Sequence, residues 1–369
     1  MAEMEAFASG PSPLELVYSV GQRNTVLVLV VCGIISLAAV LGLFGLMIFL
    51  SKKEYRHTHF RTYFICLLLA NTMQAWGTIM SLKWVVSGEV QDGPHCYAQG
   101  GIKQGGHLGA AVWSFVISLH LFNLLFLRYQ TSNVAKWAII AFGWSFTFGL
   151  VFIGPVLLQK EAKGNYFGIT NLWCWITAAY RIDQIMLEYF FQFLSIALSF
   201  FLHIVTWLRV RGNILHVNGK WLWRSGASWK LGLGRDYTDS AMLQLAQHMI
   251  WYPVAYATMV LPAAIARLPA LCGMPEIPLW LQALTGAISE LSGLVNVILF
   301  LVVSRFFPEP QDMPEFAVDR SVAEKAFGDV QSKEEIVKSW GVTPFVLTRP
   351  VSETDSVDST DRTRAGSAV

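Results

Sequence analysis

Four polar side chains lie inside long apolar segments of this chain. Glu290 and Asn296 share the last such segment, Asn71 lies in the second and His120 in the third. A charge there costs about 2.5 to 3.5 kcal/mol on insertion scales unless it faces protein or water. Counted from the segment ends on one common side, the four lie 11 to 17 residues in, a spread of about 9 Å along a helix. We expect one polar layer with Glu290 as its functional member, whereas Asn71 and Asn296 could equally bond a neighbouring carbonyl for structure.

A second group of charged and aromatic side chains falls near the segment ends on that same side, where we expect a ligand pocket. Its candidate residues are Lys83, Lys103, His107, Trp173, Arg181, Glu188 and Arg267. An anionic ligand such as a cyclic nucleotide would use the Lys and Arg members as phosphate partners. A sugar would use the carboxylates and the aromatic faces. Snorkelling to lipid headgroups explains any single cation equally well.

Motifs of common enzymes are missing from the sequence. It contains no HExxH, P-loop, GxSxG or paired CxxC motif, which argues against a hydrolase, an NTPase or a metal enzyme. We therefore expect no enzyme activity, no cofactor, no metal and no nucleic-acid partner. Gly101, Gly105 and Gly109 are spaced for close helix packing, and ligand contact through exposed backbone amides is the lesser alternative.

Seven apolar segments must position these residues. They cover residues 25–50, 62–86, 105–127, 137–158, 184–208, 242–268 and 279–303. Each exceeds the roughly 20 residues that a helix needs to cross a hydrocarbon core of about 30 Å. Hydrophobic residues make up 54% of the chain and charged residues only 14%, which is typical of a membrane protein. We predict an all-α membrane protein, a bundle of seven transmembrane helices.

The distribution of Lys and Arg predicts the orientation. With the N-terminus outside, the inner loops hold twelve of these residues and the outer loops with nearby helix ends hold six. The positive-inside rule therefore places residues 1–24 outside, the bundle at 25–307 and the tail at 308–369 in the cytoplasm. The first 24 residues show no cleavable signal peptide, so we expect the first helix to act as the signal anchor.

Cysteine positions agree with this topology. Cys96, Cys174 and Cys272 fall in loops assigned to the oxidising exterior, while Cys32 and Cys66 fall within helices. Three outer thiols allow three pairs. We favour a Cys96–Cys174 bond, because it would tether the longest outer loop to the top of the third helix.

Four segments of the chain form a recognisable set. They are Trp173-Cys174-Trp175-Ile176, Leu208-Arg209-Val210-Arg211-Gly212-Asn213, Tyr252-Pro253-Val254-Ala255-Tyr256, and Ser292-Gly293-Leu294-Val295-Asn296-Val297-Ile298-Leu299-Phe300. This set resembles fungal cAMP-receptor-like G protein-coupled receptors, a group related to the slime-mould cAMP receptors and overlapping the fungal glucose-sensing receptors. The resemblance covers about residues 24–307, and the WCWI and RGN elements are its specific parts. It implies a plasma-membrane receptor that activates a heterotrimeric G protein, and it does not supply the ligand.

Cytoplasmic residues suggest where that partner would bind. Arg128 and Tyr129 end the third helix, and Arg209 and Arg211 end the fifth. We expect them to contact the G protein, with anchoring at the membrane edge as the alternative for Arg128. The tail from Thr343 onward has the composition of a disordered segment. Candidate phosphorylation sites there are Thr348, Ser352, Thr354, Ser356, Ser359, Thr360 and Thr363.

We interpret the chain as a receptor that spans the lipid bilayer and binds an extracellular small molecule. The competing class is a small transporter or channel that uses Glu290 and intramembrane His residues as an ion relay. Transporters usually show internal repeats, and the two halves of this chain show no convincing self-similarity. A retinal protein is disfavoured because the seventh segment contains no Lys. The sequence leaves open whether the chain forms a homodimer.

Overall fold

The structure is a computed structural model that describes residues 15–49, 59–127, 131–170, 172–211, 213–217, 220–223, 250–271, 274 and 277–303. Arg128, Tyr129, Cys272 and all the candidate phosphorylation sites lie outside the described residues. The described residues divide into two units, one within residues 15–214 and 223–303 and one within residues 215–222. The division at residues 24 and 307 stays a prediction.

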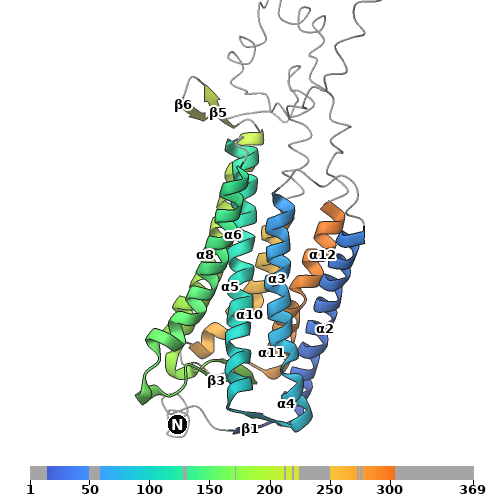
Figure 1. Ribbon diagram of the computed structural model, residues 1–369, viewed down its shortest axis with the longest axis vertical. Coiled ribbons are helices and arrows are strands. Elements are labelled where there is room, and N and C mark those ends of the chain that lie inside the picture. Colours follow the sequence, from blue (N-terminus) through green and yellow to red (C-terminus); the bar gives the residue numbers. More distant parts are fainter. Residues whose placement is uncertain are drawn as a thin grey trace, which may run out of the picture. The chain divides into compact units, whose positions relative to one another are not determined.

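The first unit is a bundle of helices, several of which are continued by short helical turns (Figure 1). Its first half comprises α2 (Val20–Phe49), α3 (Phe60–Ile79), α4 (Leu82–Ser87), α5 (Pro94–Phe122), η1 (Asn123–Leu127), α6 (Asn133–Ile153), η2 (Gly154–Leu158) and η3 (Glu161–Lys163). Its second half comprises η4 (Ala178–Tyr180), α7 (Arg181–Gln184), η5 (Ile185–Tyr189), α8 (Phe190–Arg211), α10 (Trp251–Leu271), α11 (Leu279–Glu290) and α12 (Ser292–Val303).

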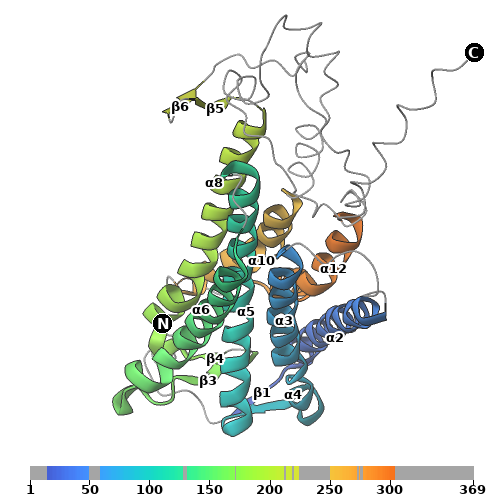
Figure 2. The same cartoon turned by 45° about the horizontal axis from the view of Figure 1, so that its top comes forward.

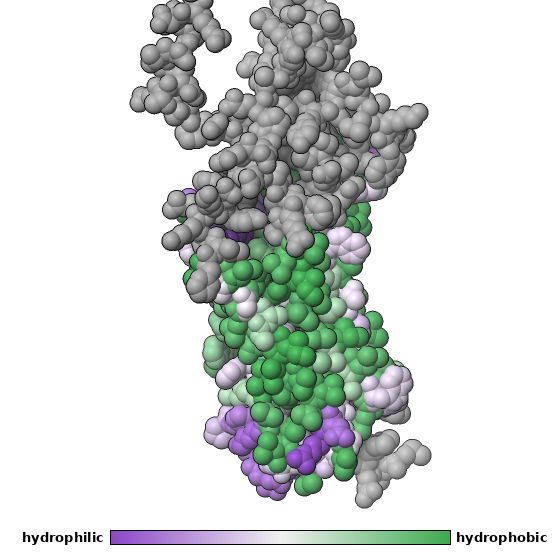
Figure 3. Space-filling model, turned by 90° about the vertical axis from the view of Figure 1, so that its right-hand side faces the viewer, coloured by the Kyte–Doolittle hydropathy of each residue, from purple (hydrophilic) through white to green (hydrophobic). Residues whose placement is uncertain are grey.

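The surface and length of the helices are those of a multi-pass membrane protein. Among the described residues, five helices are long and apolar enough to cross a membrane, and the bent pair α11 and α12 makes a sixth. The helix α10 is not among them, so the seventh span stays a prediction. Figure 3 shows a broad hydrophobic surface on the face that carries α2, and Leu27, Val28 and Val31 of α2 are exposed. Lipid contact accounts for such a surface, since a soluble protein would rarely leave it in water.

The segments that follow the fifth helix contain one bend and two prolines. The pair α11 and α12 bends by 40° at Leu291, directly after Glu290. Pro262 and Pro269 lie inside α10, where proline removes a backbone hydrogen bond and clashes with the preceding turn.

The third helix packs against the second more closely than side chains larger than glycine would allow. A Cβ atom on Gly106 would lie 2.5 Å from the backbone nitrogen of Gln74, and one on Gly109 would lie 2.9 Å from the Cβ atom of Ala70. A Cβ atom on Gly105 would lie 2.9 Å from the Cε atom of Met73. These contacts confirm the packing role predicted for Gly105 and Gly109. The helix α5 begins at Pro94, so the glycines lie inside the helix and not at its start near residue 105.

Three small two-stranded sheets complete the described chain. Strand β1 (Glu15–Val17) pairs with β2 (Glu89–Gln91), and β3 (Phe167–Thr170) pairs with β4 (Trp173–Ile176) in a register that sets Ile169 opposite Cys174. Strands β5 (Ile214–Val217) and β6 (Lys220–Trp223) form the third sheet. The β3–β4 hairpin lies against α5 (Figure 2). We call the end of the bundle that carries this hairpin the hairpin end.

Candidate functional site

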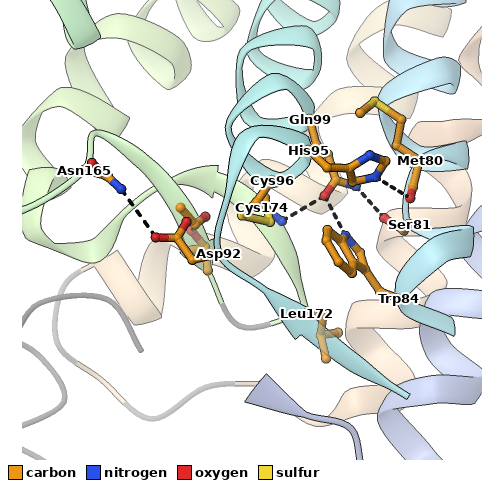
Figure 4. Close-up of a disulfide and its surroundings, with 12 residues drawn as sticks. Met80, Ser81, Trp84, Asp92, His95, Cys96, Gln99, Asn165, Leu172 and Cys174 are labelled. Atoms are coloured by element: carbon orange, nitrogen blue, oxygen red, sulfur yellow. Dashed lines mark hydrogen bonds between the residues drawn. A yellow bond between two sulfur atoms is a disulfide. The ribbon is translucent and has the colours of Figure 1, made fainter. Parts of the chain in front are cut away.

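A disulfide anchors the hairpin to the third helix. Cys96 in the first turn of α5 is bonded to Cys174 in β4 (Figure 4), which confirms the predicted pair. Both residues are fully buried. Within the described residues, Cys32 and Cys66 are free thiols. The bond holds the WCWI strand over the hairpin end of the bundle.

Gln99 supports this disulfide from one helical turn further along α5. Its Oε1 atom accepts hydrogen bonds from Trp84 Nε1 at 2.9 Å and from the backbone nitrogen of Cys174 at 3.3 Å. Its amide nitrogen donates to the Gly77 carbonyl at 2.9 Å and to Ser81 Oγ at 2.7 Å. Figure 4 shows Gln99 between the disulfide and Trp84. One buried amide therefore joins α3, α4, α5 and β4.

The N-terminal strand is tied to the same hairpin. The Tyr18 hydroxyl donates a hydrogen bond to the carbonyl of Leu172. Burial raises the pKa of Tyr18, so the hydroxyl keeps the proton that this bond needs. In the loop before β3, burial likewise raises the pKa of Tyr166. The ring of Tyr166 fits there because Gly154 has no Cβ atom, which would lie 2.2 Å from the ring.

The hairpin brings two tryptophan rings onto the cations of the bundle. Lys103 Nζ lies 4.7 Å from the centroid of the Trp173 ring. The guanidinium carbon of Arg267 lies 4.5 Å from the same centroid and 5.2 Å from that of Trp175. Cation–π contacts of this kind gain strength when the partners are shielded from water. Helices α5 and α10 are thereby connected through the β4 strand.

Glu188 is held by donors from three sides. Its Oε1 atom lies 2.6 Å from His107 Nδ1 and accepts a hydrogen bond from Gln192 Nε2 at 3.4 Å. Its Oε2 atom accepts a hydrogen bond from Trp175 Nε1 at 2.6 Å. Glu188 belongs to η5 and is buried. Both of its oxygens are thus engaged by protein donors, and it joins η5 to α5 and β4.

Glu290 is engaged on one oxygen only. Its Oε1 atom accepts a hydrogen bond from Thr78 Oγ1 at 2.7 Å and lies 3.8 Å from Lys103 Nζ. Lys103 in turn donates to Thr78 Oγ1 at 2.9 Å. All three side chains are buried, and Glu290 Oε2 has no hydrogen-bond partner among the described residues. A buried carboxylate oxygen of this kind is costly unless a donor reaches it.

We call Lys103, His107, Trp173, Trp175, Glu188, Arg267 and Glu290 the charged cluster. It unites five of the seven predicted ligand candidates and adds Trp175 and Glu290. Lys83 stands apart, because it is exposed and lies 4.9 Å from the Trp84 ring centroid. Arg181 begins α7 and makes none of the contacts described above. Thr78 and Gln192 were not predicted, since a single polar residue in an apolar segment carries no signal of its partner.

The predicted polar layer is spread over three levels along α3. Glu290 contacts Thr78, and Asn71 accepts a hydrogen bond from Ser292 Oγ at 3.3 Å. The His120 ring packs edge-on against Tyr63 with centroids 5.3 Å apart. Thr78 and Tyr63 are 15 residues apart, or about 22 Å along a helix. The expectation of one layer assumed that the third helix starts at residue 105, whereas it starts at Pro94, which sets His120 deeper by about 16 Å.

Asn296 and the residues predicted to meet a G protein lie elsewhere. Asn296 is buried in α12. The guanidinium carbon of Arg209 lies 4.9 Å from the ring centroid of Phe126 in η1, and Arg211 is the last residue of α8. The third and fifth helices therefore meet near Arg209, at the end of the bundle opposite the hairpin.

Comparison with known proteins identifies the fold. No protein-family model matches the sequence, and no curated protein matches it. Among solved structures, the chain is similar to the crystal structure of squid rhodopsin, with a TM-score of 0.57 and 13% sequence identity. The match covers 90% of this chain and 94% of that chain. The helical bundle thus has a rhodopsin-like fold.

Proposed function

We propose that this protein is a G protein-coupled receptor of the plasma membrane that senses an extracellular small molecule and activates a heterotrimeric G protein. The observation that carries the proposal is the charged cluster, which lies beneath a disulfide-anchored hairpin in a bundle with a rhodopsin-like fold. The WCWI strand that carries the fungal cAMP-receptor-like resemblance supplies both tryptophans of this cluster. We therefore also propose membership of that group.

The disulfide supports the orientation. Disulfides form and persist in oxidising compartments, so the hairpin end with Cys96 and Cys174 would face the exterior. The end near Arg209 would then face the cytoplasm. This agrees with the excess of Lys and Arg in the loops assigned to the inside.

The geometry favours an anionic ligand over a sugar. Both oxygens of Glu188 are already occupied by protein donors, so this carboxylate has little capacity left for sugar hydroxyls. Lys103 and Arg267 both lie on the Trp173 ring, and their mutual repulsion would fall when an anion binds. A planar guanidinium also matches carboxylate and phosphate groups. The ligand would place its anionic group on these cations and an apolar or aromatic part on the tryptophans.

Glu290 connects this site to the part of the bundle that would move. It contacts α3 through Thr78 and α5 through Lys103, and the 40° bend between α11 and α12 follows it directly. Ligand binding to Lys103 would change the charge balance at Glu290 and favour a second arrangement of these helices. Opening of the opposite end would expose Arg128, Tyr129, Arg209 and Arg211 to the G protein. Phosphorylation of the tail would then regulate the response.

The test is nucleotide exchange on a G protein by the purified full-length chain in lipid nanodiscs. The ligand panel contains cyclic nucleotides, small carboxylates and neutral sugars. We expect an anionic compound to accelerate exchange, and we expect Arg267→Ala and Lys103→Ala to weaken its effect at least tenfold. The exposed Lys83→Ala variant is the matched control and should respond like the unmodified chain. Acceleration by a sugar with unchanged potency in both variants would overturn the proposed site.

A further inference from the structure

Gln104 is a buried amide directly beside the charged cluster. Its side chain is fully buried, and neither its Nε2 atom nor its Oε1 atom has a hydrogen-bond partner among the described residues. We propose that Gln104 belongs to the ligand site, where its amide forms two hydrogen bonds with a planar donor–acceptor edge of the ligand. The ligand is then an anion that also carries a carboxamide or a nitrogen heterocycle. This inference deepens the proposed function and rests on it for the presence of a ligand.

A second buried glutamine on the same helix shows how a purely structural amide is bonded. Gln99 and Gln104 both lie on α5, and both are 0% exposed. Gln99 makes four hydrogen bonds, which join α3, α4 and β4 to its own helix. Gln104 makes none within the part of the chain that the structure describes. A buried amide without partners costs free energy that an apolar side chain of the same size avoids, so its presence needs an explanation other than packing.

The position of Gln104 on α5 places it beneath the hairpin. Residues four apart share one face of a helix, so Gln104 lies on the same face as Gly100 and Leu108. A Cβ atom on Gly100 would lie 2.8 Å from the ring of Phe167 in β3. Leu108 belongs to the buried core cluster that contains Phe167 and Trp175. The amide of Gln104 is thus positioned between two turns of α5 that both pack against the hairpin.

The neighbours of Gln104 along the helix belong to the charged cluster. Lys103 directly precedes it, and His107, which follows after three residues, lies 2.6 Å from Glu188 through its Nδ1 atom. Consecutive residues of a helix are about 100° apart around its axis. Lys103 and Gln104 therefore lie on neighbouring sides of α5. A ligand whose anionic group rests on Lys103 and Arg267 would reach Gln104 with a second polar group.

The chemistry of the amide selects that second group. A glutamine side chain has one acceptor oxygen and a nitrogen with two donor hydrogens. A carboxylate or a phosphate has acceptors only, so it would leave Oε1 unpaired. A hydroxyl carries both functions on one oxygen and pairs with one amide atom at a time. A carboxamide, or a heterocycle edge such as that of adenine, sets a donor beside an acceptor and forms two parallel bonds with a glutamine amide.

The first test is thermal unfolding of the purified full-length chain in nanodiscs without added compound. Gln104→Met replaces the amide by an apolar side chain of similar length, and we expect a melting temperature equal to or above that of the unmodified chain. Gln99→Met is the matched control, because it leaves Trp84 Nε1 without its acceptor and should lower the melting temperature by about 2 to 4 °C. Gln104→Leu is the second variant if Gln104→Met does not fold.

The outcome of this first test does not depend on knowing the ligand. A loss in both Gln104 variants as large as that in Gln99→Met, or a failure of both to fold, would overturn the proposal. The amide would then have a partner in the protein without ligand, such as an ordered water, and would be structural.

The second test measures binding of two matched pairs of probes by isothermal titration calorimetry. Succinamate and levulinate differ only in an amino group against a methyl group. Cyclic adenosine monophosphate is paired with its analogue that has hydrogen in place of the 6-amino group. In one of the pairs, we expect the compound with the amino group to bind the unmodified chain at least about tenfold more tightly, and we expect Gln104→Met to remove this difference.

The results separate the ligand class from the receptor function. Binding that does not depend on the amino group, absence of binding by all four probes, or a difference that persists in Gln104→Met would overturn the role of Gln104. Binding with the expected dependence, but without accelerated nucleotide exchange on a G protein, would support the site and count against the proposed receptor function instead.

Discussion

The two ends of the bundle are held together by different kinds of contact. At the hairpin end, a disulfide, the amide of Gln99, the Lys103–Glu290 ion pair and the His107–Glu188 hydrogen bond join helices and strands. At the opposite end, ring contacts are prominent: Phe64 stacks on Phe300 with centroids 4.7 Å apart, and the Tyr63 ring packs edge-on against His120. One polar contact there joins His59 Nε2 to the carbonyl oxygen of Thr131 at 2.7 Å. The hydroxyls of Tyr63 and Tyr252 have no hydrogen-bond partner among the described residues.

This difference bears on which end can rearrange. When one partner of a buried polar contact moves away, the group left behind is unpaired and costs free energy, and this cost is largest for buried charges. Ring packing without directional bonds is less specific about position. The hairpin end is therefore suited to hold a preformed ligand site, and the opposite end is suited to open for a partner. Four substitutions test that contrast.

The largest effect is expected from removing one member of the buried pair at the hairpin end. Lys103→Met keeps the length of the side chain but leaves Glu290 as an uncompensated buried charge. Breaking such a pair costs about 3 to 5 kcal/mol, which chemical denaturation of the protein in detergent would measure. Lys83→Met changes an exposed lysine at the same end and should cost less than about 0.5 kcal/mol. Equal effects of the two substitutions would show that the pair contributes nothing.

Loss of the disulfide should come next. Cys96→Ser frees the β3–β4 hairpin, and removal of a native disulfide from a small domain costs about 2 to 5 kcal/mol. Thermal unfolding would detect the loss. Non-reducing peptide mapping of the unmodified chain should recover the linked Cys96 and Cys174 peptides. Recovery of Cys272 linked to either one would contradict the assignment.

Gln99→Ala should destabilise the hairpin end through its unpaired neighbours. It leaves Trp84 Nε1 and the Cys174 amide without their acceptor, at about 1 to 3 kcal/mol for each buried group. The control is Gln91→Ala, since Gln91 is exposed and bonds Glu89 in the same strand. If both variants unfold at the same denaturant concentration as the unmodified chain, Gln99 does not organise this end.

The smallest effect is expected from Tyr63→Phe at the opposite end. The ring contacts with His120 and Trp113 are kept, and the lost hydroxyl has no partner among the described residues. We expect a change in unfolding free energy within about 0.5 kcal/mol, or a small gain from removing a buried unpaired group. A loss above about 2 kcal/mol would show that this end also depends on directional bonds.

Much of the site could be predicted from the sequence because charges and cysteines are rare in apolar segments. Cys96 and Cys174 fell in loops on one side, and Lys103, His107, Glu188 and Arg267 stood near segment ends on that side. The cost of burying such groups leaves few places for them except against one another. This reasoning found the cluster but not its pairing, since Lys103 could have met either carboxylate.

Depth along the helices was the part that could not be predicted. Hydropathy places a segment in the membrane but does not fix where a helix begins, and the glycines before residue 110 concealed the first eleven residues of α5. The bend after Glu290 was not predicted either, although Ser292 and Gly293 directly after it form the kind of Ser/Gly pair at which helices kink. Gln99 was not predicted for a related reason. Its importance comes from four hydrogen bonds to groups that are distant in the sequence.

We propose that an anionic ligand binds the charged cluster and thereby drives the bundle into its G protein-binding arrangement. A cryo-electron microscopy structure of the full-length chain with an activating compound and its G protein tests this most directly. We expect ligand density with its anionic group against Lys103 and Arg267, an altered contact between Lys103 and Glu290, and a G protein bound at the end that carries Arg209. Ligand density away from Trp173 and Arg267, with the Lys103–Glu290 contact unchanged in the active complex, would contradict it.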